Sequence, residues 1–208
     1  MDYIKIALAK GRIGRNAYNV LKKAGIGDSI DLDSRKLVFK DEKKEIEYIC
    51  VKPSDVVTYV QNGVADLGIV GKDTILENDN DVYEIFDFGF GKCTFSIAGK
   101  DSQTIYSKDK SLRVATKYPN ITKKYFGSKQ QRIEIIKLNG SVELAPLVGL
   151  SDVIVDLVET GNTLKANGLQ VIEEMFDISV RLICNRISYR FKYDRIVDIV
   201  QSLDEVKN

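Results

Sequence analysis

One stretch of the chain combines an acidic residue with a short turn of hydroxyl, glycine and amide residues. Asp156 follows the apolar residues Val153–Val155, which predict a strand, and precedes the turn Thr160-Gly161-Asn162-Thr163. The residues after the turn, Leu164–Gly168, could form a short helix. A strand, a loop of small residues and a helix N-terminus together gather backbone N–H groups that can bind a phosphate.

The side chains of this stretch suit a phosphorylated sugar. The hydroxyls of Thr160 and Thr163 can add hydrogen-bond donors, and Gly161 allows close backbone approach or a positive φ. Asp156 would repel a phosphate, so it is better suited to accept hydrogen bonds from sugar hydroxyls or to meet a metal ion. An ordinary strand–turn–helix junction with a threonine N-cap explains the same residues, and the stretch alone leaves that alternative open.

The chain contains no histidine, which excludes several kinds of active site. A Ser-His-Asp triad, a histidine-ligated metal and an imidazole base are all ruled out. Chemistry must then rest on carboxylates, cations, hydroxyls and backbone donors, with or without a metal ion on substrate oxygens. Transfer from a diphosphate-activated substrate suits this set, because metal-bound pyrophosphate is already a good leaving group.

Composition indicates a cytoplasmic globular protein. The net charge of +1 gives no bulk field that would attract nucleic acid or an anionic membrane. No apolar run approaches the roughly 20 residues that span a bilayer, and the N-terminal apolar stretch is too short for a signal peptide. Cys50, Cys93 and Cys184 are odd in number and widely spaced, which fits free thiols better than disulfides or a zinc site.

A second candidate site lies near the N-terminus. Lys10-Gly11-Arg12 follows a predicted strand, residues 3–9, and precedes a segment whose apolar residues recur at helical spacing. Cations that follow the carboxyl end of a strand lie where open α/β sheets bind ligands. A solvated basic turn is the alternative.

Predicted strands and helices alternate along the chain with short connections. This pattern predicts an α/β fold with mostly parallel sheets and helices on both faces. We expect two lobes, one formed by residues 1–90 plus 178–208 and the other by residues 91–177, with a ligand cleft between them. Lys100–Lys110 is expected to be a loop or a short exposed helix, and Arg181–Ile187 a strand.

Several segments resemble the ATP phosphoribosyltransferase family. Glu143–Leu164 resembles the family signature, and further blocks that are similar to the family occur in order at residues 9–12, 55–60, 63–73 and 88–93. The resemblance implies a two-lobed fold of the periplasmic-binding-protein type II class. It also implies a glycosyltransferase reaction, in which N1 of ATP displaces pyrophosphate from phosphoribosyl diphosphate in the first step of histidine biosynthesis.

The resemblance also implies a cofactor and partners. Mg²⁺ is expected as the cofactor, with its protein ligands unknown. The length implies the short form of the family, a catalytic subunit that works with a histidyl-tRNA-synthetase-like regulatory subunit in a hetero-octamer and forms a homodimer alone. No nucleic acid or membrane partner is expected.

Site residues are carried over from the resemblance as hypotheses. Phosphoribosyl diphosphate is expected to contact Glu143, Asp156, Thr160, Gly161, Asn162 and Thr163. ATP or pyrophosphate is expected to contact Lys10, Gly11, Arg12, Arg35 and Asp73, and the expected catalytic residues are Arg35, Lys52 and Asp156. Glu143 could instead be a solvated helix residue and Asp73 a helix cap. Lys52 stands where the family commonly has Arg, which keeps the charge but loses the planar fork.

Two other functions stay open at the level of sequence. One is a cytoplasmic small-molecule binding protein with the same lobed fold, which would not explain the acid and turn together. The other is a salvage phosphoribosyltransferase that acts on a free base. Such enzymes usually carry paired acidic residues before the loop, whereas Val155 precedes Asp156 here.

Overall fold

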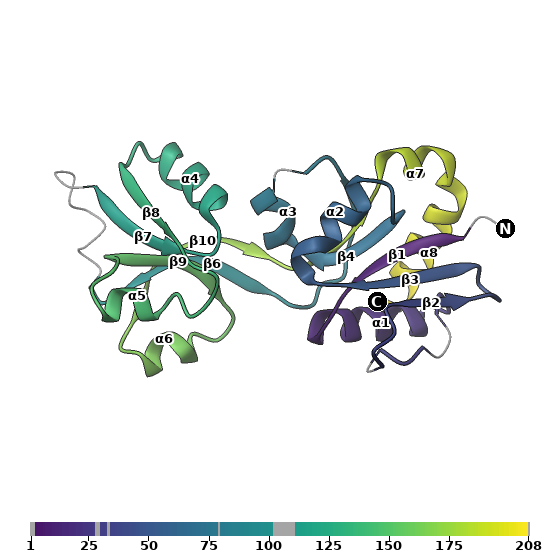
Figure 1. The fold of residues 1–208 in the computed structure, drawn as a ribbon, viewed down its shortest axis with the longest axis horizontal. Coiled ribbons are helices and arrows are strands. Elements are labelled where there is room, and N and C mark those ends of the chain that lie inside the picture. Colours follow the sequence, from purple (N-terminus) through teal and green to yellow (C-terminus); the bar gives the residue numbers. More distant parts are fainter. Residues whose placement is uncertain (1–2, 28–29, 33, 79, 102–110, 208) are drawn as a thin grey trace. The chain divides into compact units, whose positions relative to one another are not determined.

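The computed structural model describes the chain except residues 1–2, 28–29, 33, 79, 102–110 and 208, and the described residues form two compact units (Figure 1). Unit 1 takes the described residues of Met1–Ile75, Asp79–Gly91 and Ser179–Asn208, and unit 2 takes Leu76–Asn78 and those of Lys92–Ile178. The crossovers expected after residues 90 and 177 each differ from these boundaries by one residue. Most of the expected loop at Lys100–Lys110 lies outside the described residues.

The sheet of unit 1 is built around a strand that is buried on both faces, β1 (Ile4–Ala9). Ile4, Ile6 and Leu8 pack into one core, and Ala7 and Ala9 pack into the core on the other face. The strand order is β2-β3-β1-β4-β11-β5, with β2 at Val38–Asp41, β3 at Ile46–Val51, β4 at Leu67–Gly71, β5 at Tyr83–Asp87 and β11 at Val180–Cys184.

Helices cover both faces of this sheet. α1 (Arg12–Lys23) and α8 (Tyr193–Lys207) pack on the Leu8 side, and α2 (Val56–Gln61) packs on the Ala7 side after a short 3₁₀ turn at Pro53–Asp55. α8 buries Ile196, Ile199 and Leu203, which recur every three or four residues as an amphipathic helix requires. The remaining helices are α3 (Lys72–Asn78) and α7 (Arg186–Phe191).

The strand predicted at Arg181–Ile187 is wrong at its end, because Asn185 stops it and starts α7. The Asn185 Oδ1 atom accepts hydrogen bonds from the backbone N–H groups of Ile187 at 2.9 Å and Ser188 at 3.0 Å. This is N-cap geometry, which satisfies donors that a helix leaves unpaired at its start.

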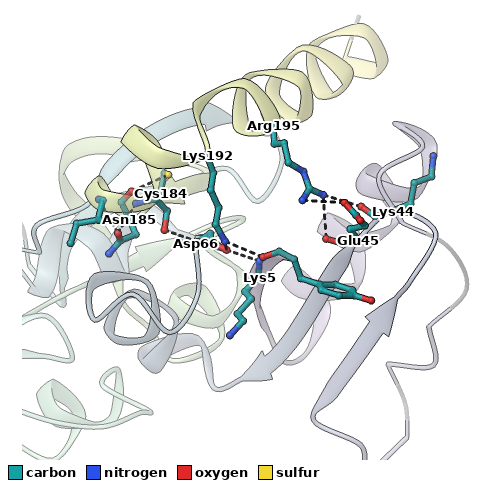
Figure 2. A network of polar contacts seen from close by, with 11 residues as sticks. Lys5, Lys44, Glu45, Asp66, Cys184, Asn185, Lys192 and Arg195 are labelled. Carbon is teal, nitrogen blue, oxygen red and sulfur yellow. Dashed lines mark hydrogen bonds and ion pairs between the residues drawn. The ribbon is translucent and has the colours of Figure 1, made fainter. Parts of the chain in front are cut away.

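A buried carboxylate ties the C-terminal helices to the sheet, as Figure 2 shows. Asp66 is 6% exposed and accepts hydrogen bonds from the Lys5 backbone N–H at 2.8 Å and the Ser188 hydroxyl at 2.6 Å. It also pairs with the Lys192 ammonium at 3.1 Å. A buried charge is tolerated when it is paired and hydrogen-bonded in this way, so the network holds α7 and the start of α8 in place.

The sheet of unit 2 also has a helix layer on each face. Its strand order is β10-β6-β9-β7-β8, with β6 at Cys93–Gly99, β7 at Leu112–Thr116, β8 at Ile133–Lys137, β9 at Val153–Val158 and β10 at Gln170–Ile178. α4 (Pro119–Ser128) packs on the face that contains Phe95 and Val155. α5 (Leu144–Leu147) and α6 (Asn162–Ala166) are on the opposite face, which contains Ala98 and Ile154.

The predicted α/β fold is confirmed, but the sheets are mixed rather than mostly parallel, with four parallel and five antiparallel strand pairs among the described residues. Parallel pairing joins β1 to β3 and β4, and β7 to β8 and β9, whereas the other strand pairs are antiparallel. Parallel neighbours need a long crossover connection. β2 and β3 are joined by a short turn, so they pair antiparallel.

Two further expectations concern the membrane and the cysteines. None of the described helices is long and apolar enough to cross a bilayer. The three cysteines are free thiols, as predicted, and Cys50 and Cys184 are buried. Burial raises the pKa of Cys184 to about 12, so this thiol is not a nucleophile near neutral pH.

Candidate functional site

A cavity of about 280 Å³ in unit 2 brings the acidic residues and the turn together. It is lined by the segment 156–164 with Glu143 and Ile154, and we call it the loop cavity. The structure therefore gathers all six residues that were expected to contact phosphoribosyl diphosphate at one place in one unit.

Strand periodicity places Asp156 in this cavity. Val153 and Val155 of β9 pack into the core beneath α4, while Ile154 packs into the core beneath α5 and α6. Alternate side chains of a strand share a face, so Asp156 lies on the same face as Ile154. Its side chain is half-buried at the rim of that core.

The turn after β9 starts its helix at a glycine. Gly161 is the N-cap of α6 with a φ of 72°, a left-handed conformation that glycine adopts without strain, and no side chain caps the helix. A threonine N-cap is therefore not what this junction contains. The first intrahelical bond runs from the Lys165 N–H to the Gly161 carbonyl. The Asn162 N–H donates a long hydrogen bond, 3.4 Å, to the Thr160 hydroxyl just before the helix.

Glu143 reaches the cavity because α5 is anchored beside it. Glu143 is the residue immediately before α5, and it is partly buried. Ala145 and Pro146 of this helix are buried, and Ala145 packs into the core that also contains Ile154. Three acidic residues, Glu143, Asp156 and Glu159, thus line the cavity together with the hydroxyls and backbone of the turn. Carboxylates can accept hydrogen bonds from a diol, and hydroxyls and backbone N–H groups can donate to a phosphate.

Three of the expected unit 1 residues share one edge of its sheet. Lys10 follows β1, Lys52 follows β3 and Asp73 follows β4, and these three strands are parallel neighbours. The carboxyl ends of parallel strands meet at one edge, where α/β sheets bind ligands. Gly11 is the N-cap of α1 with a φ of 99°, and Arg12 is the first residue of that helix.

Arg35 and Asp73 have local surroundings that bear on their roles. Arg35 is exposed just before β2, and the Leu37 carbonyl accepts from the Cys50 N–H at 2.8 Å, which places this segment beside the carboxyl end of β3. Asp73 is the second residue of α3, and a Cβ on Gly71 would lie 2.2 Å from its Oδ1 atom. The carboxylate of Asp73 therefore folds back over Gly71 in the first helical turn, where a negative charge is favourable.

Sequence reasoning missed a second cavity, of about 370 Å³, which shares part of the same turn. Thr94, Ser96 and Glu174 line it together with Thr160 and Gly161. Ser96 pairs across the sheet with both Asp156 and Glu174, so these three side chains share a face. The available signal was a single serine among apolar residues of a predicted strand, which does not reveal its partners.

Comparison with known proteins gives one consistent family. The sequence profile described as ATP phosphoribosyltransferase matches residues 52–205. The chain is 67% identical to an ATP phosphoribosyltransferase of Clostridioides difficile over 208 residues, which covers 100% of both chains. It is 54% identical to one of Brachyspira hyodysenteriae over 207 residues, which covers 98% of this chain and 99% of the relative.

Solved structures agree with the sequence relatives. A chain of the ATP phosphoribosyl transferase (HisG:HisZ) complex from Thermotoga maritima superposes with a TM-score of 0.86 and 38% identity, and the match covers 98% of each chain. The periplasmic aliphatic sulphonate binding protein SsuA from Escherichia coli superposes with a TM-score of 0.62 at 13% identity, over 100% of this chain and 73% of that protein. The second likeness concerns the fold alone and supports the expected periplasmic-binding-protein-like class.

Proposed function

The chain belongs to the ATP phosphoribosyltransferase family, and from that premise we propose that it transfers the 5-phosphoribosyl group of phosphoribosyl diphosphate to N1 of ATP. The enzyme of this name catalyses the first step of histidine biosynthesis. The observation that carries the proposal for this chain is the loop cavity, where Glu143 and Asp156 lie beside the turn 160–163. Family membership favours this pentosyl transfer over a binding protein or a salvage enzyme.

We assign the donor substrate to the loop cavity. The N–H groups at the start of α6 and the hydroxyls of Thr160 and Thr163 would bind the 5-phosphate, with Asn162 beside them and Gly161 letting the backbone approach. Asp156 and Glu143 would accept hydrogen bonds from the ribose 2- and 3-hydroxyls. This division follows the chemistry of the lining, since a phosphate needs donors and a diol needs acceptors.

The same carboxylates would assist the transfer. The bond from ribose C1 to pyrophosphate breaks with its electron pair leaving on the diphosphate, and the N1 lone pair of adenine forms the new C1–N1 bond. Positive charge develops on the ribose as the old bond breaks, so negative side chains near the ring stabilise the transition state. Adenine N1 already carries a lone pair, so the enzyme needs no general base for the attack and works by positioning and charge stabilisation.

We assign ATP and pyrophosphate to the cations of unit 1. Lys10, Gly11, Arg12 and Asp73 would contact one of these ligands, and Arg35 and Lys52 would support the charge that develops on the leaving group. The common sheet edge of Lys10, Lys52 and Asp73 supports this assignment. Lys acts as a point charge and Arg as a bidentate donor, so Lys52 and Arg35 would contribute differently.

The donor set is compatible with Mg²⁺ bound through the substrate. Among the described residues, no group of three or more His, Cys, Asp or Glu side chains could hold a metal ion. Mg²⁺ typically binds through one or two carboxylates together with substrate phosphates and water. Glu143 and Asp156 beside the proposed donor site fit that requirement, and the bound ion would neutralise charge on the departing pyrophosphate.

We further propose a regulatory partner. The solved relative from Thermotoga maritima is a complex of two different proteins, HisG and HisZ. The first two curated relatives are matched over 99–100% of their own length, which supports the short form of the family. This chain would accordingly form a homodimer alone and a hetero-octamer with a histidyl-tRNA-synthetase-like subunit, and it would act in the cytoplasm, where its phosphorylated substrates are made.

One assay tests the proposed reaction. The protein is mixed with ATP, phosphoribosyl diphosphate and Mg²⁺, with and without the candidate regulatory subunit, and both the nucleotide adduct and pyrophosphate are followed. Equal amounts of the two products are expected. No adduct under either condition would contradict the proposed function.

A further inference from the structure

A single arginine side chain contacts the segment that connects Glu143 to Asp156 of the loop cavity. Arg113 lies on β7, and its guanidinium forms two hydrogen bonds to the Asp152 carboxylate, Nη2 to Oδ1 at 2.7 Å and Nε to Oδ2 at 3.3 Å. The Nη1 atom donates to the carbonyl oxygens of Gly149 at 3.1 Å and Leu150 at 3.3 Å. One planar group therefore contacts three residues of the connection between α5 and β9.

The backbone of Arg113 strengthens this attachment. Its N–H donates to Asp152 Oδ2 at 2.9 Å, and its carbonyl accepts from the Asp152 N–H at 2.9 Å. An ion pair near the surface contributes little to stability by itself. A bidentate guanidinium–carboxylate pair nevertheless fixes geometry, which a single charge cannot do.

The connection needs such an attachment because α5 is very short. A helix of four residues is unstable in isolation, so its position depends on tertiary contacts. Its C-terminal end turns at Gly149, where φ is 77°, and closes with a hydrogen bond from the Leu150 N–H to the Ala145 carbonyl at 2.9 Å. Arg113 thus contacts the turn that ends α5 as well as Asp152, the residue immediately before β9.

We propose that Arg113 is a positioning residue that sets the location of Glu143 relative to Asp156 for binding the ribose diol. The proposal rests on the function proposed above. Glu143 begins the helix that Arg113 anchors, and Asp156 belongs to the strand that follows Asp152. When the contact between Arg113 and Asp152 is weakened, Glu143 can shift while Asp156 stays in the sheet. Small misplacements of groups in an active site reduce catalysis strongly.

The test compares Arg113→Lys with wild type in steady-state assays in which each substrate is varied separately. Lysine keeps the charge but cannot form the fork. We expect the KM for phosphoribosyl diphosphate to rise about tenfold, while the KM for ATP changes by less than about twofold. Arg132→Lys, an arginine of the same unit just before β8, is the matched control and is expected to behave as wild type.

A double-mutant cycle separates positioning from general loosening. If Arg113 acts through Glu143, then Arg113→Lys adds little to the donor KM of a Glu143→Gln variant, because groups that act together are not additive. Fully additive effects would overturn the proposal. Asp152→Asn weakens the same guanidinium–carboxylate pair by removing the charge of its acidic partner. It is expected to raise the KM for phosphoribosyl diphosphate selectively as well, so it replaces Arg113→Lys should that variant not fold.

The outcomes distinguish the two proposals. A wild-type protein that forms no adduct contradicts the proposed function itself. An active wild type with an Arg113→Lys variant of unchanged donor KM contradicts only the role of Arg113.

Discussion

Asp156 of β9 lies directly opposite Ser96 of β6, and both side chains are on the α5–α6 face of unit 2. Ser96 is 1% exposed and also pairs with Glu174 on its other side. Directly opposed side chains in antiparallel strands are close neighbours. The small buried serine therefore leaves room above the sheet between two acidic residues, and the two cavities share Thr160 and Gly161 of the turn that follows Asp156.

Replacing Asp156 with asparagine is expected to lower kcat/KM for phosphoribosyl diphosphate at least tenfold, about 1.4 kcal/mol of transition-state stabilisation. The change keeps the shape of the side chain but removes the charge that would stabilise the ribose as it becomes positive. Steady-state kinetics measure the effect. Glu205→Gln on the exposed side of α8, outside the loop cavity, is the control, and an Asp156→Asn enzyme with wild-type kinetics would remove Asp156 from the site.

The turn before α6 is expected to require its glycine for the backbone alone. A Cβ on Gly161 would meet Val158 at 3.8 Å, an ordinary contact, so the cost of Gly161→Ala comes from its φ of 72°. That conformation costs a non-glycine residue about 1–2 kcal/mol, and Asn tolerates it better than Ala does. The affinity for phosphoribosyl diphosphate and the Tm should therefore both fall in Gly161→Ala. Both should be partly restored in Gly161→Asn. Equal behaviour of the two variants would contradict this explanation.

Lys52→Ala is expected to reduce kcat more than it raises the KM for either substrate. The lysine follows β3 at the edge of the unit 1 sheet, where its charge would support the leaving pyrophosphate rather than the bound substrates. Lys52→Arg keeps the charge and adds a fork, so it should retain activity. Unchanged turnover in Lys52→Ala would exclude Lys52 from catalysis.

Asp87 is expected to contribute to stability in a pH-dependent way. Burial opposes the ionisation of Asp87, but three contacts hold its pKa below the ordinary value. The carboxylate accepts hydrogen bonds from the Gly89 N–H at 2.8 Å and the Ser179 hydroxyl at 2.7 Å, and it forms an ion pair with the Arg181 guanidinium at 3.2 Å. A lowered folded-state pKa stabilises the fold above the unfolded pKa of about 3.9, and the effect is lost as pH falls through the folded value.

Asp87→Asn should therefore lower Tm at pH 7 by a few degrees, about 1 kcal/mol, with the difference from wild type shrinking below about pH 4. Melting curves across pH measure this difference. Glu205→Gln on the exposed side of α8 is the control. A difference in Tm that stays constant down to pH 2 would show that ionisation of Asp87 is not the cause.

The local part of the site could be predicted from sequence, since its signals are local. The apolar run before Asp156 fixes a strand, and Thr160-Gly161-Asn162-Thr163 is typical of a turn. Ser96 could not be found in this way, because its importance comes from pairing with Asp156 and Glu174 across the sheet. The contact of Arg113 with Asp152 is equally non-local.

Two strand boundaries show why the rest of the fold was harder to predict. β10 runs from Gln170 to Ile178, and register shifts at Val171/Glu173 and Glu174/Phe176 break the two-residue alternation by which a sequence signals a strand. The end of β11 depends on Asn185, whose side chain also donates to the Val60 carbonyl at 2.8 Å. That partner is distant in sequence, so Ile187 and its neighbours looked compatible with a strand.

The most direct test of the central claim is calorimetric titration of phosphoribosyl diphosphate with Mg²⁺ into wild type, Glu143→Gln and Asp156→Asn. If the loop cavity holds the ribose and its 5-phosphate, wild type binds the donor, each single variant binds it about tenfold more weakly, and the control Glu205→Gln binds it as wild type does. Equal donor affinity in wild type and both cavity variants would contradict the assignment of the donor to this cavity.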